Sequence, residues 1–526
     1  MTRRWTRIAG RLGVAAALLG AAAFGATRTA DAGGPGLEAS TPAIRPVPYR
    51  WIPRAAPAES APSEGALQRR FAGLAAHLQR SGDRALPAET LEGLDSLVAK
   101  ASRRADVAVH ARDLRTGAVL YDAHGDALLN PASNQKVFTG AAALDLLGSE
   151  YRFETRVLRA GRALVLVGEG DPVLDGDDLQ AMAVIVAEQL ELGDVERIIV
   201  DDSAFAPRRF GPGLYDPDGF GAPHEAPSGA LSVDFNTIEV RVAPVAGQTT
   251  PSVEVQGAGA HVEVRNDAEV GRRGFVSVQT YAEDGKTIVH VRGSMSRRAR
   301  SVVTRRRILD PGLHAGTVFA ERLAEQWASQ PLPVERGEAP MQAETLVVNE
   351  SAPLAEILER GLAYSNNFIA EQLLRTMAWR VYDEPGSWAM GVDILEAYWA
   401  GLGREEAPVV ENGSGLSRRG RLTASGLVDV LVAAHRETPA LLDALPAAGD
   451  PGTLRRRLLR SSGRVRAKTG TLNGVTGLTG VLTDERGTPT VAFSVLVTAH
   501  NPAAMPAAKR RKVEDAVVYA LLEHAG

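Results

Sequence analysis

Residues 129–148, LNPASNQKVFTGAAALDLLG, have the composition of an apolar helix that carries a serine and a lysine near its start. Ser133 and Lys136 are three residues apart, so on a helix they share one face. Asn130 is a good N-cap and Pro131 suits the first helical position, which predicts Ser133 at the third. The Ser133 N–H would then have no partner in the helix, and a nucleophilic serine needs such a donor beside the developing oxyanion. Lys136 is the candidate base, if burial or a nearby cation lowers its pKa.

A Ser-x-x-Lys match is weak on its own, because a serine at a helix start is usually a cap. Two distant stretches strengthen it: LAYSNNFIAEQLL contains Ser365 and Asn367, and RAKTGTLNGV contains a Lys-Thr-Gly element at Lys468. Together and in this order, the three elements are typical of serine enzymes that react with penicillin. The chain has only six lysines among its 59 basic residues, and two of them, Lys136 and Lys468, occupy motif positions.

The second and third elements have chemical tasks beside the serine. Ser365 can relay a proton to the leaving amine, and Asn367 can hold the substrate amide and orient the base. Lys468 offers a cation to a substrate carboxylate and helps to keep the base neutral.

The Lys-Thr-Gly strand is expected to bind the end of the substrate. Thr469 and Thr471 offer hydroxyls to the same carboxylate, and the N–H of Thr471 is the predicted second oxyanion donor. Gly470 has no side chain, so we expect a peptide to lie against the strand there and pair with it.

Beyond these motifs, the chain resembles the class C low-molecular-mass penicillin-binding proteins, the D-alanyl-D-alanine carboxypeptidase/endopeptidases. The resemblance covers about residues 85–525 and includes GDPVL (170–174), DDSAF (201–205) and NGSGLSRRGRLTA (412–424). It implies an α+β fold, in which a transpeptidase/β-lactamase-like domain has an antiparallel five-stranded sheet flanked by helices. The same resemblance implies inserted, mostly β accessory domains.

By this resemblance, Ser133 is the acylated nucleophile and Lys136 is its base. Leu416 and Arg418 match positions that line the pocket for the acyl-donor side chain. One departure is Asn412, where the family usually has Asp; this position lies beside the pocket rather than in the catalytic set. The resemblance completes the site with the other motif residues: Ser365, Asn367, Lys468, Thr469, Gly470 and Thr471.

Composition divides the chain into segments that suit this family. Residues 1–32 combine arginines, an apolar run and small residues, which is typical of a secretory signal peptide, and 33–84 have the composition of a Pro/Ala-rich linker with a leading helix. We expect the catalytic domain in 85–150 plus 310–526, and two β-rich accessory domains in 151–309. The signal predicts export, to the periplasm or the cell wall.

Composition and spacing also exclude several kinds of site. The net charge of −4 gives no electrostatic case for nucleic acid, and the absence of cysteine excludes thiolate nucleophiles and ligands. No two histidines have His-x-x-x-His spacing, so we expect neither a metal nor another cofactor. The expected partners are peptidoglycan stem peptides and, as covalent inhibitors, β-lactam antibiotics. Membrane contact is expected to be peripheral or absent after signal cleavage.

These features predict a serine D-Ala-D-Ala carboxypeptidase/DD-endopeptidase that acts on peptidoglycan stem peptides through an acyl-enzyme on Ser133 and is inhibited by penicillin. One alternative is a serine β-lactamase, which shares the motifs. Class A enzymes have a much shorter gap than the 232 residues between Ser133 and Ser365, and a Glu-containing loop for deacylation that is not found here. The other alternative is a non-catalytic cell-wall-binding protein, although every residue that the mechanism needs is present.

Overall fold

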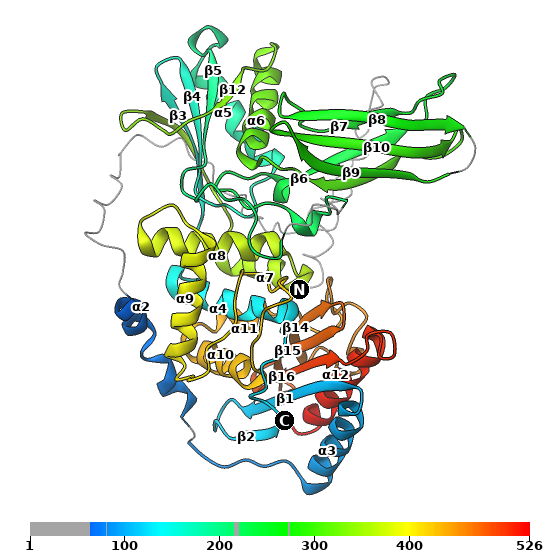
Figure 1. Cartoon of the computed structure of the whole chain (residues 1–526). Coiled ribbons are helices and arrows are strands. Elements are labelled where there is room, and N and C mark those ends of the chain that lie inside the picture. Colours follow the sequence, from blue (N-terminus) through cyan, green and yellow to red (C-terminus); the bar gives the residue numbers. More distant parts are fainter. Residues whose placement is uncertain (1–63, 80, 215–219, 272–273, 526) are drawn as a thin grey trace, which may run out of the picture. The chain divides into compact units, whose positions relative to one another are not determined.

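The computed structural model describes residues 64–79, 81–214, 220–271 and 274–525 (Figure 1). The predicted signal peptide (1–32) and the linker up to residue 63 lie outside this part of the chain. The leading helix expected within 33–84 corresponds to α2 (Glu64–Phe71), followed by the 3-10 helix η2 (Leu74–Leu78). Within the described ranges, no helix has both the length and the apolar composition needed to span a bilayer.

A five-stranded sheet forms the centre of the unit that the sequence predicts to be catalytic, in the order β14-β15-β16-β1-β2, and all neighbouring strands are antiparallel. It combines strands from both ends of the described chain: β1 (Ala105–Asp113), β2 (Val119–Ala123), β14 (Val465–Leu472), β15 (Val475–Thr483) and β16 (Pro489–Ala499). Every residue of β15 is buried, because this strand is covered on both faces. The predicted α+β class with an antiparallel five-stranded sheet is confirmed.

Because successive side chains point to opposite faces of the sheet, each strand contributes residues to two different cores. Val107 and Val109 of β1 face the core formed with α3 (Ala88–Ser102) and α12 (Ala507–Leu522). Ala108, which lies between them, faces the core formed with α4 (Gln135–Leu147) and α10 (Ala424–Glu437). Helices therefore cover both faces of the sheet, as a two-sided apolar strand requires.

The apolar helix predicted from residues 129–148 is α4, and it is buried on all sides from Gln135 to Leu144. Its neighbours are α7 (Leu354–Tyr364), α8 (Asn367–Tyr382), α9 (Trp388–Gly401) and α10. The ring of Phe138 lies 5.8 Å from that of Tyr398 and 5.4 Å from that of Trp399. A helix that is apolar all round is what such a central position needs.

The chain between α4 and α7 forms three more sheets. The first has the order β12-β5-β4-β3-β13, mixes parallel and antiparallel pairs, and packs against α5 (Gly176–Gln189) and α6 (Pro311–Trp327). Its strands are β3 (Glu154–Ala160), β4 (Ala163–Gly168), β5 (Arg197–Asp201), β12 (Val334–Arg336) and β13 (Glu344–Glu350).

The other two sheets have three strands each, in the orders β8-β10-β9 and β11-β6-β7. They share one apolar core, to which Val240 of β6 and Val291 of β10 contribute. Their strands are β6 (Thr237–Ala243), β7 (Ser252–Val255), β8 (Val262–Gly271), β9 (Val276–Glu283), β10 (Lys286–Ser296) and β11 (Val302–Arg307).

After residue 310, where the sequence predicts the return to the catalytic domain, the chain first adds strands to an inserted sheet. The helix α6 and the strands β12 and β13 follow that residue, yet they complete the first inserted sheet. β12 pairs in parallel with β5, and β13 pairs antiparallel with β3. These pairings join segments far apart in sequence, and β12 has only three residues, so local composition carries no sign of them.

Candidate active site

Ser133 lies in the short 3-10 helix η3 (Ala132–Asn134), directly before α4, and not at the third position of an α-helix as predicted. The difference begins at Ala132, whose φ of +47° is left-handed. Such a residue costs roughly 1–2 kcal/mol, so its surroundings must hold it in place. Asn130 supplies one restraint, because its Oδ1 accepts from the Ala132 N–H at 2.8 Å. Ser133 therefore lies half-buried on a tight turn.

Lys136 is in direct contact with the Ser133 hydroxyl. Its Nζ lies 3.1 Å from Ser133 Oγ, 2.8 Å from Asn367 Oδ1 and 2.8 Å from the carbonyl oxygen of Ser414. Burial lowers the pKa of Lys136 to about 7, although the Glu371 carboxylate acts in the opposite direction. The amide and carbonyl oxygens can only accept, so a neutral Lys136 donates its two protons to them and directs its lone pair at the hydroxyl. This geometry suits proton transfer from Ser133 Oγ to Lys136 Nζ.

Lys468 lies against the second motif. Its Nζ is 2.8 Å from Ser365 Oγ and 2.6 Å from the carbonyl oxygen of Thr469, and its side chain is wholly buried. Burial and the nearby Lys136 lower the pKa of Lys468 well below its ordinary value. Burial and the neighbouring amine thus both work against a charged Lys468, and a carboxylate placed beside it would work in the opposite direction.

The break between α7 and α8 carries the Ser-Asn-Asn element. Ser365 ends α7 in a left-handed conformation, with φ of +57°, and Asn366 caps α8 by accepting from the Ile369 N–H at 3.3 Å. Asn367 faces the base on one side and donates its Nδ2 to the carbonyl oxygen of His224 at 3.0 Å on the other. The element therefore serves as a helix cap and as part of the site, and it contacts the inserted segment.

The edge of β14 is open where the two threonines lie. Residues 446–448 pair only with the first half of the strand, at Val465 and Ala467, with N···O distances of 2.8 and 3.0 Å. By alternation, the N–H groups of Thr469 and Thr471 point to the same edge, beyond the end of this pairing. Among the described residues, the Thr469 hydroxyl has no hydrogen-bond partner. This edge can therefore accept an extended peptide.

Gly470 also has a structural role, beside its predicted role in binding the peptide. A Cβ atom there would lie 2.6 Å from Asn134 Nδ2 and 2.8 Å from the carbonyl oxygen of Pro131. The missing side chain thus lets β14 pack against the turn that carries the serine. Next to it, Thr471 Oγ1 accepts from Arg511 Nη2 at 3.2 Å, which brings a guanidinium of α12 to the strand. No sequence motif indicated this arginine.

The segment Asn412–Gly415, called the strap below, completes the surroundings of Lys136. Its Ser414 carbonyl accepts from Lys136, and its backbone N–H groups donate to Glu371 of α8. Asn412 donates its Nδ2 to the carbonyl oxygen of Pro212, in the inserted segment, at 2.8 Å. An ionised aspartate, the usual family residue, could not make this bond. The motifs predicted neither the strap nor Glu371.

Leu416 and Arg418 follow the strap and lie beside the serine turn. Asn130 Nδ2 donates to the carbonyl oxygens of Ser417 and Arg418, at 3.1 Å in each case. The Leu416 side chain is half-buried and that of Arg418 is exposed. The structure thus brings both residues close to the serine turn, and their predicted contact with the substrate side chain stays a prediction.

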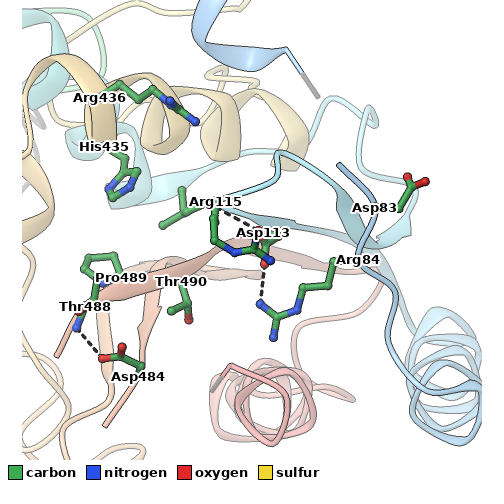
Figure 2. A pocket seen from close by; sticks show the side chains of 11 residues that line it. Asp83, Arg84, Asp113, Arg115, His435, Arg436, Asp484, Thr488, Pro489 and Thr490 are labelled. Carbon is green, nitrogen blue, oxygen red and sulfur yellow. Dashed lines mark hydrogen bonds and ion pairs between the residues drawn. The ribbon is translucent and has the colours of Figure 1, made fainter. Parts of the chain in front are cut away.

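A cavity of about 1000 Å³ lies elsewhere on the catalytic unit (Figure 2). Its lining includes Asp113 at the end of β1 and Thr490 near the start of β16, and it contains none of the motif residues. Asp113 has a structural role, because its carboxylate accepts hydrogen bonds from Arg84 and Thr116. In the part of the chain that the structure describes, no three His, Cys, Asp or Glu side chains are grouped to hold a metal ion.

Comparison with known proteins relates most of the chain to one family. The sequence profile of the D-Ala-D-Ala carboxypeptidase 3 (S13) family matches residues 90–518. A D-alanyl-D-alanine carboxypeptidase of Actinomadura sp. (strain R39) is 35% identical over 447 residues, which are 79% of this chain and 80% of that protein. Carboxypeptidase Rv3627c of Mycobacterium tuberculosis is 32% identical over 401 residues, or 71% and 72% of the two chains. The fold matches penicillin binding protein 4 of Haemophilus influenzae with a TM-score of 0.68, at 23% identity, over 82% of this chain and 99% of that one.

The contact of Gly470 with the serine turn gives a testable prediction. In Gly470→Ala, the new Cβ would push β14 away from the turn, and displacements of this kind slow catalysis strongly. We expect labelling of Ser133 by a fluorescent penicillin to be at least about tenfold slower. Gly93→Ala in α3 is the matched control, because a Cβ there has no neighbour within 4 Å, and it should keep the parental rate. An unchanged rate in Gly470→Ala would contradict this account of the glycine.

Proposed function

The chain belongs to the D-Ala-D-Ala carboxypeptidase 3 (S13) family and is therefore a serine peptidase, in which we propose that Ser133 is the nucleophile. The observation that carries this proposal is the 3.1 Å contact between Ser133 Oγ and the Nζ of the buried Lys136. With a pKa of about 7, this amine is largely uncharged at slightly alkaline pH and can accept a proton. Serine and base thus meet within hydrogen-bond reach, which is the first requirement for an activated nucleophile.

In the first half of the reaction, Ser133 Oγ attacks the carbonyl carbon before the terminal D-residue, and its proton passes to Lys136 Nζ. Negative charge develops on the carbonyl oxygen, and the N–H groups of Ser133 and Thr471 are the proposed donors to it. The support for Thr471 is the orientation of its N–H towards the open edge of β14.

Collapse of the tetrahedral intermediate breaks the C–N bond and leaves an acyl-enzyme on Ser133. The leaving nitrogen must gain one proton, and Ser365 is the proposed relay because its hydroxyl lies 2.8 Å from Lys468 Nζ. The proton that Lys136 took from Ser133 replaces the one given to the leaving nitrogen, so Lys136 is a free base again before water attacks. Water then attacks the acyl carbon with Lys136 again as base, which breaks the ester bond and returns the proton to Ser133 Oγ.

Recognition of the substrate terminus is assigned to β14. Lys468, the free hydroxyl of Thr469 and the hydroxyl of Thr471 are the proposed partners of the terminal carboxylate, with Arg511 as an additional cation beside Thr471. A carboxylate placed there would raise the pKa of Lys468 and draw a proton to it. The scissile peptide would pair with the open edge as an added strand, while Leu416 and Arg418 would meet the acyl-donor side chain.

The substrates proposed for this site are peptidoglycan stem peptides that end in D-Ala-D-Ala, and the same acyl-enzyme chemistry fits cleavage of D-Ala cross-links. β-Lactams should acylate Ser133, because a strained amide mimics the peptide terminus. The composition of residues 1–32 supports export to the periplasm or the cell wall. The domain limits of the catalytic unit and its inserts are likewise proposals.

A long-lived penicilloyl adduct is expected at this site, which argues against a β-lactamase. In class A β-lactamases, rapid deacylation uses a glutamate carboxylate in addition to the lysine of the Ser-x-x-Lys element. The groups that contact Lys136 Nζ are a hydroxyl, an amide oxygen and a backbone carbonyl oxygen. The nearby Glu371 carboxylate is only 1% exposed and already accepts from backbone N–H groups, so it is not available to water.

Hydrolysis of a pentapeptide ending in D-Ala-D-Ala tests the proposed function. The parent protein should release D-alanine, and Ser133→Ala should reduce the rate by at least about 10³-fold while the fold is kept. Analysis of released D-alanine and of digested muropeptides gives the measurement. Equal activity of the parent and Ser133→Ala, or no release by either, would refute the assignment of Ser133.

The lowered pKa of Lys136 predicts the pH dependence of acylation. Only the free amine can take the Ser133 proton, so the rate should rise with pH through a midpoint near the pKa of about 7. Labelling by a fluorescent penicillin between about pH 5 and pH 9 measures this rising part of the pH profile, called the acid limb below. Lys136→Arg should not be labelled at any of these values, because a guanidinium stays protonated. A midpoint near the ordinary lysine pKa of about 10 would contradict the role of Lys136.

A further inference from the structure

The strap is bound to α4 through three successive carbonyl groups. The Asn412 carbonyl accepts from the Gln135 side chain, and that of Gly413 accepts from Thr139 Oγ1 at 2.7 Å. The third carbonyl, that of Ser414, accepts from Lys136 Nζ at 2.8 Å. One stretch of backbone thus binds the proposed base and two of its neighbours on the same helix.

The opposite side of the strap is held by a single carboxylate, that of Glu371 in α8. Its Oε2 accepts from the Gly413 N–H at 3.1 Å and its Oε1 from the Ser414 N–H at 2.9 Å. The indole Nε1 of Trp388 donates to Oε2 at 2.7 Å. Glu371 is 1% exposed, and a buried carboxylate is tolerated only with such donors and nearby positive charge.

The peptide unit between Gly413 and Ser414 is therefore fixed from both sides. A Cβ at Gly413 would lie 2.3 Å from the carbonyl oxygen of Ala370, so the strap also packs directly on the backbone of α8. Within the ranges that the structure describes, the only anionic side chain bonded to the strap backbone is that of Glu371. If this carboxylate were lost, two buried N–H groups would have no partner. The Ser414 carbonyl would keep the restraint on its own peptide unit, where the Gly415 N–H donates to Asn412 Oδ1 at 2.9 Å, but it would lose the support of the preceding peptide unit.

We propose that Glu371 is a positioning residue for the acylation step, which holds the Ser414 carbonyl against Lys136 and supplies the negative charge that accompanies the protonated base. This inference rests on the proposed function of Lys136 as the base. Glu371 does not contact the nucleophile or the substrate. It acts on Lys136 through the strap and through the electric field of its carboxylate.

The charged groups around the two residues define the expected direction of the effect. Burial lowers the pKa of Lys136 and Glu371 raises it, and Lys468 is a neighbouring amine whose own pKa is lowered by burial and by Lys136. Arg375, one turn further along α8, also lies in the field of Glu371, and its guanidinium stacks on Trp388 at 4.3 Å. Removing the carboxylate charge should therefore lower the pKa of Lys136 and move the acid limb of acylation to lower pH.

The test compares the full-length parent with Glu371→Gln and Thr139→Val, using the rate of labelling by a fluorescent penicillin as a function of pH. Glu371→Gln should be at least about tenfold slower on the plateau, with its midpoint shifted by about one unit to lower pH. Thr139→Val removes one uncharged bond to the strap, so it should slow labelling without moving the midpoint. If Glu371 had a purely structural role, its replacement would slow labelling but would not shift the midpoint of the acid limb.

Glu371→Asp provides a second arm, because it keeps the charge and shortens the side chain. We expect a lower plateau rate than in the parent, with an unchanged midpoint. This variant tests the inference even if Glu371→Gln fails to fold. An unshifted midpoint in a folded Glu371→Gln, or a parental plateau in Glu371→Asp, would overturn the inference and leave Lys136 as the base. A parent without any limb near pH 7 would instead overturn the proposed function and this inference together.

Discussion

The proposed active site depends on the burial of one amine beside one hydroxyl. Lys136 lies inside the helical layer, and this loss of solvent brings its pKa to about 7. Such burial is tolerated only because Asn367 Oδ1 and the Ser414 carbonyl replace water, each at 2.8 Å. These partners come from the start of α8 and from the strap, so the base works only when three distant segments are packed together. The surrounding helices are thus part of the chemistry as well as its support.

Much of the proposed catalytic set could be predicted from the sequence, because short motifs with defined chemistry mark it. In the structure, Lys136 bonds to Ser133 and Asn367, Lys468 bonds to Ser365, and Lys136 affects the pKa of Lys468. The backbone geometry around Ser133 was harder to predict, because the left-handed φ of Ala132 places the serine before α4 rather than in it. Alanine gives no sign of such a conformation, which its tertiary surroundings impose.

Glu371 and the strap could not be predicted from the motifs, because backbone carbonyls and N–H groups have no sequence signature. One signal was present: apart from Asp145 near its end, α4 has its polar side chains near its start, and Gln135, Lys136 and Thr139 all bind the strap. The pairing of β12 with β5 could not be predicted for a related reason, because it joins segments far apart in sequence. The inserted segment also reaches the site, through the carbonyl groups of Pro212 and His224.

The most direct test of this account is a titration of the lysine side chains themselves. The chain has only six lysines, so protein labelled with ¹³C at lysine Cε should give few signals, and Lys136→Arg assigns the relevant one. The account predicts one Cε signal that titrates with a midpoint near the pKa of about 7 and is absent from Lys136→Arg. If that signal instead titrated near pH 10, like an ordinary lysine, the buried amine could not be the base that activates Ser133.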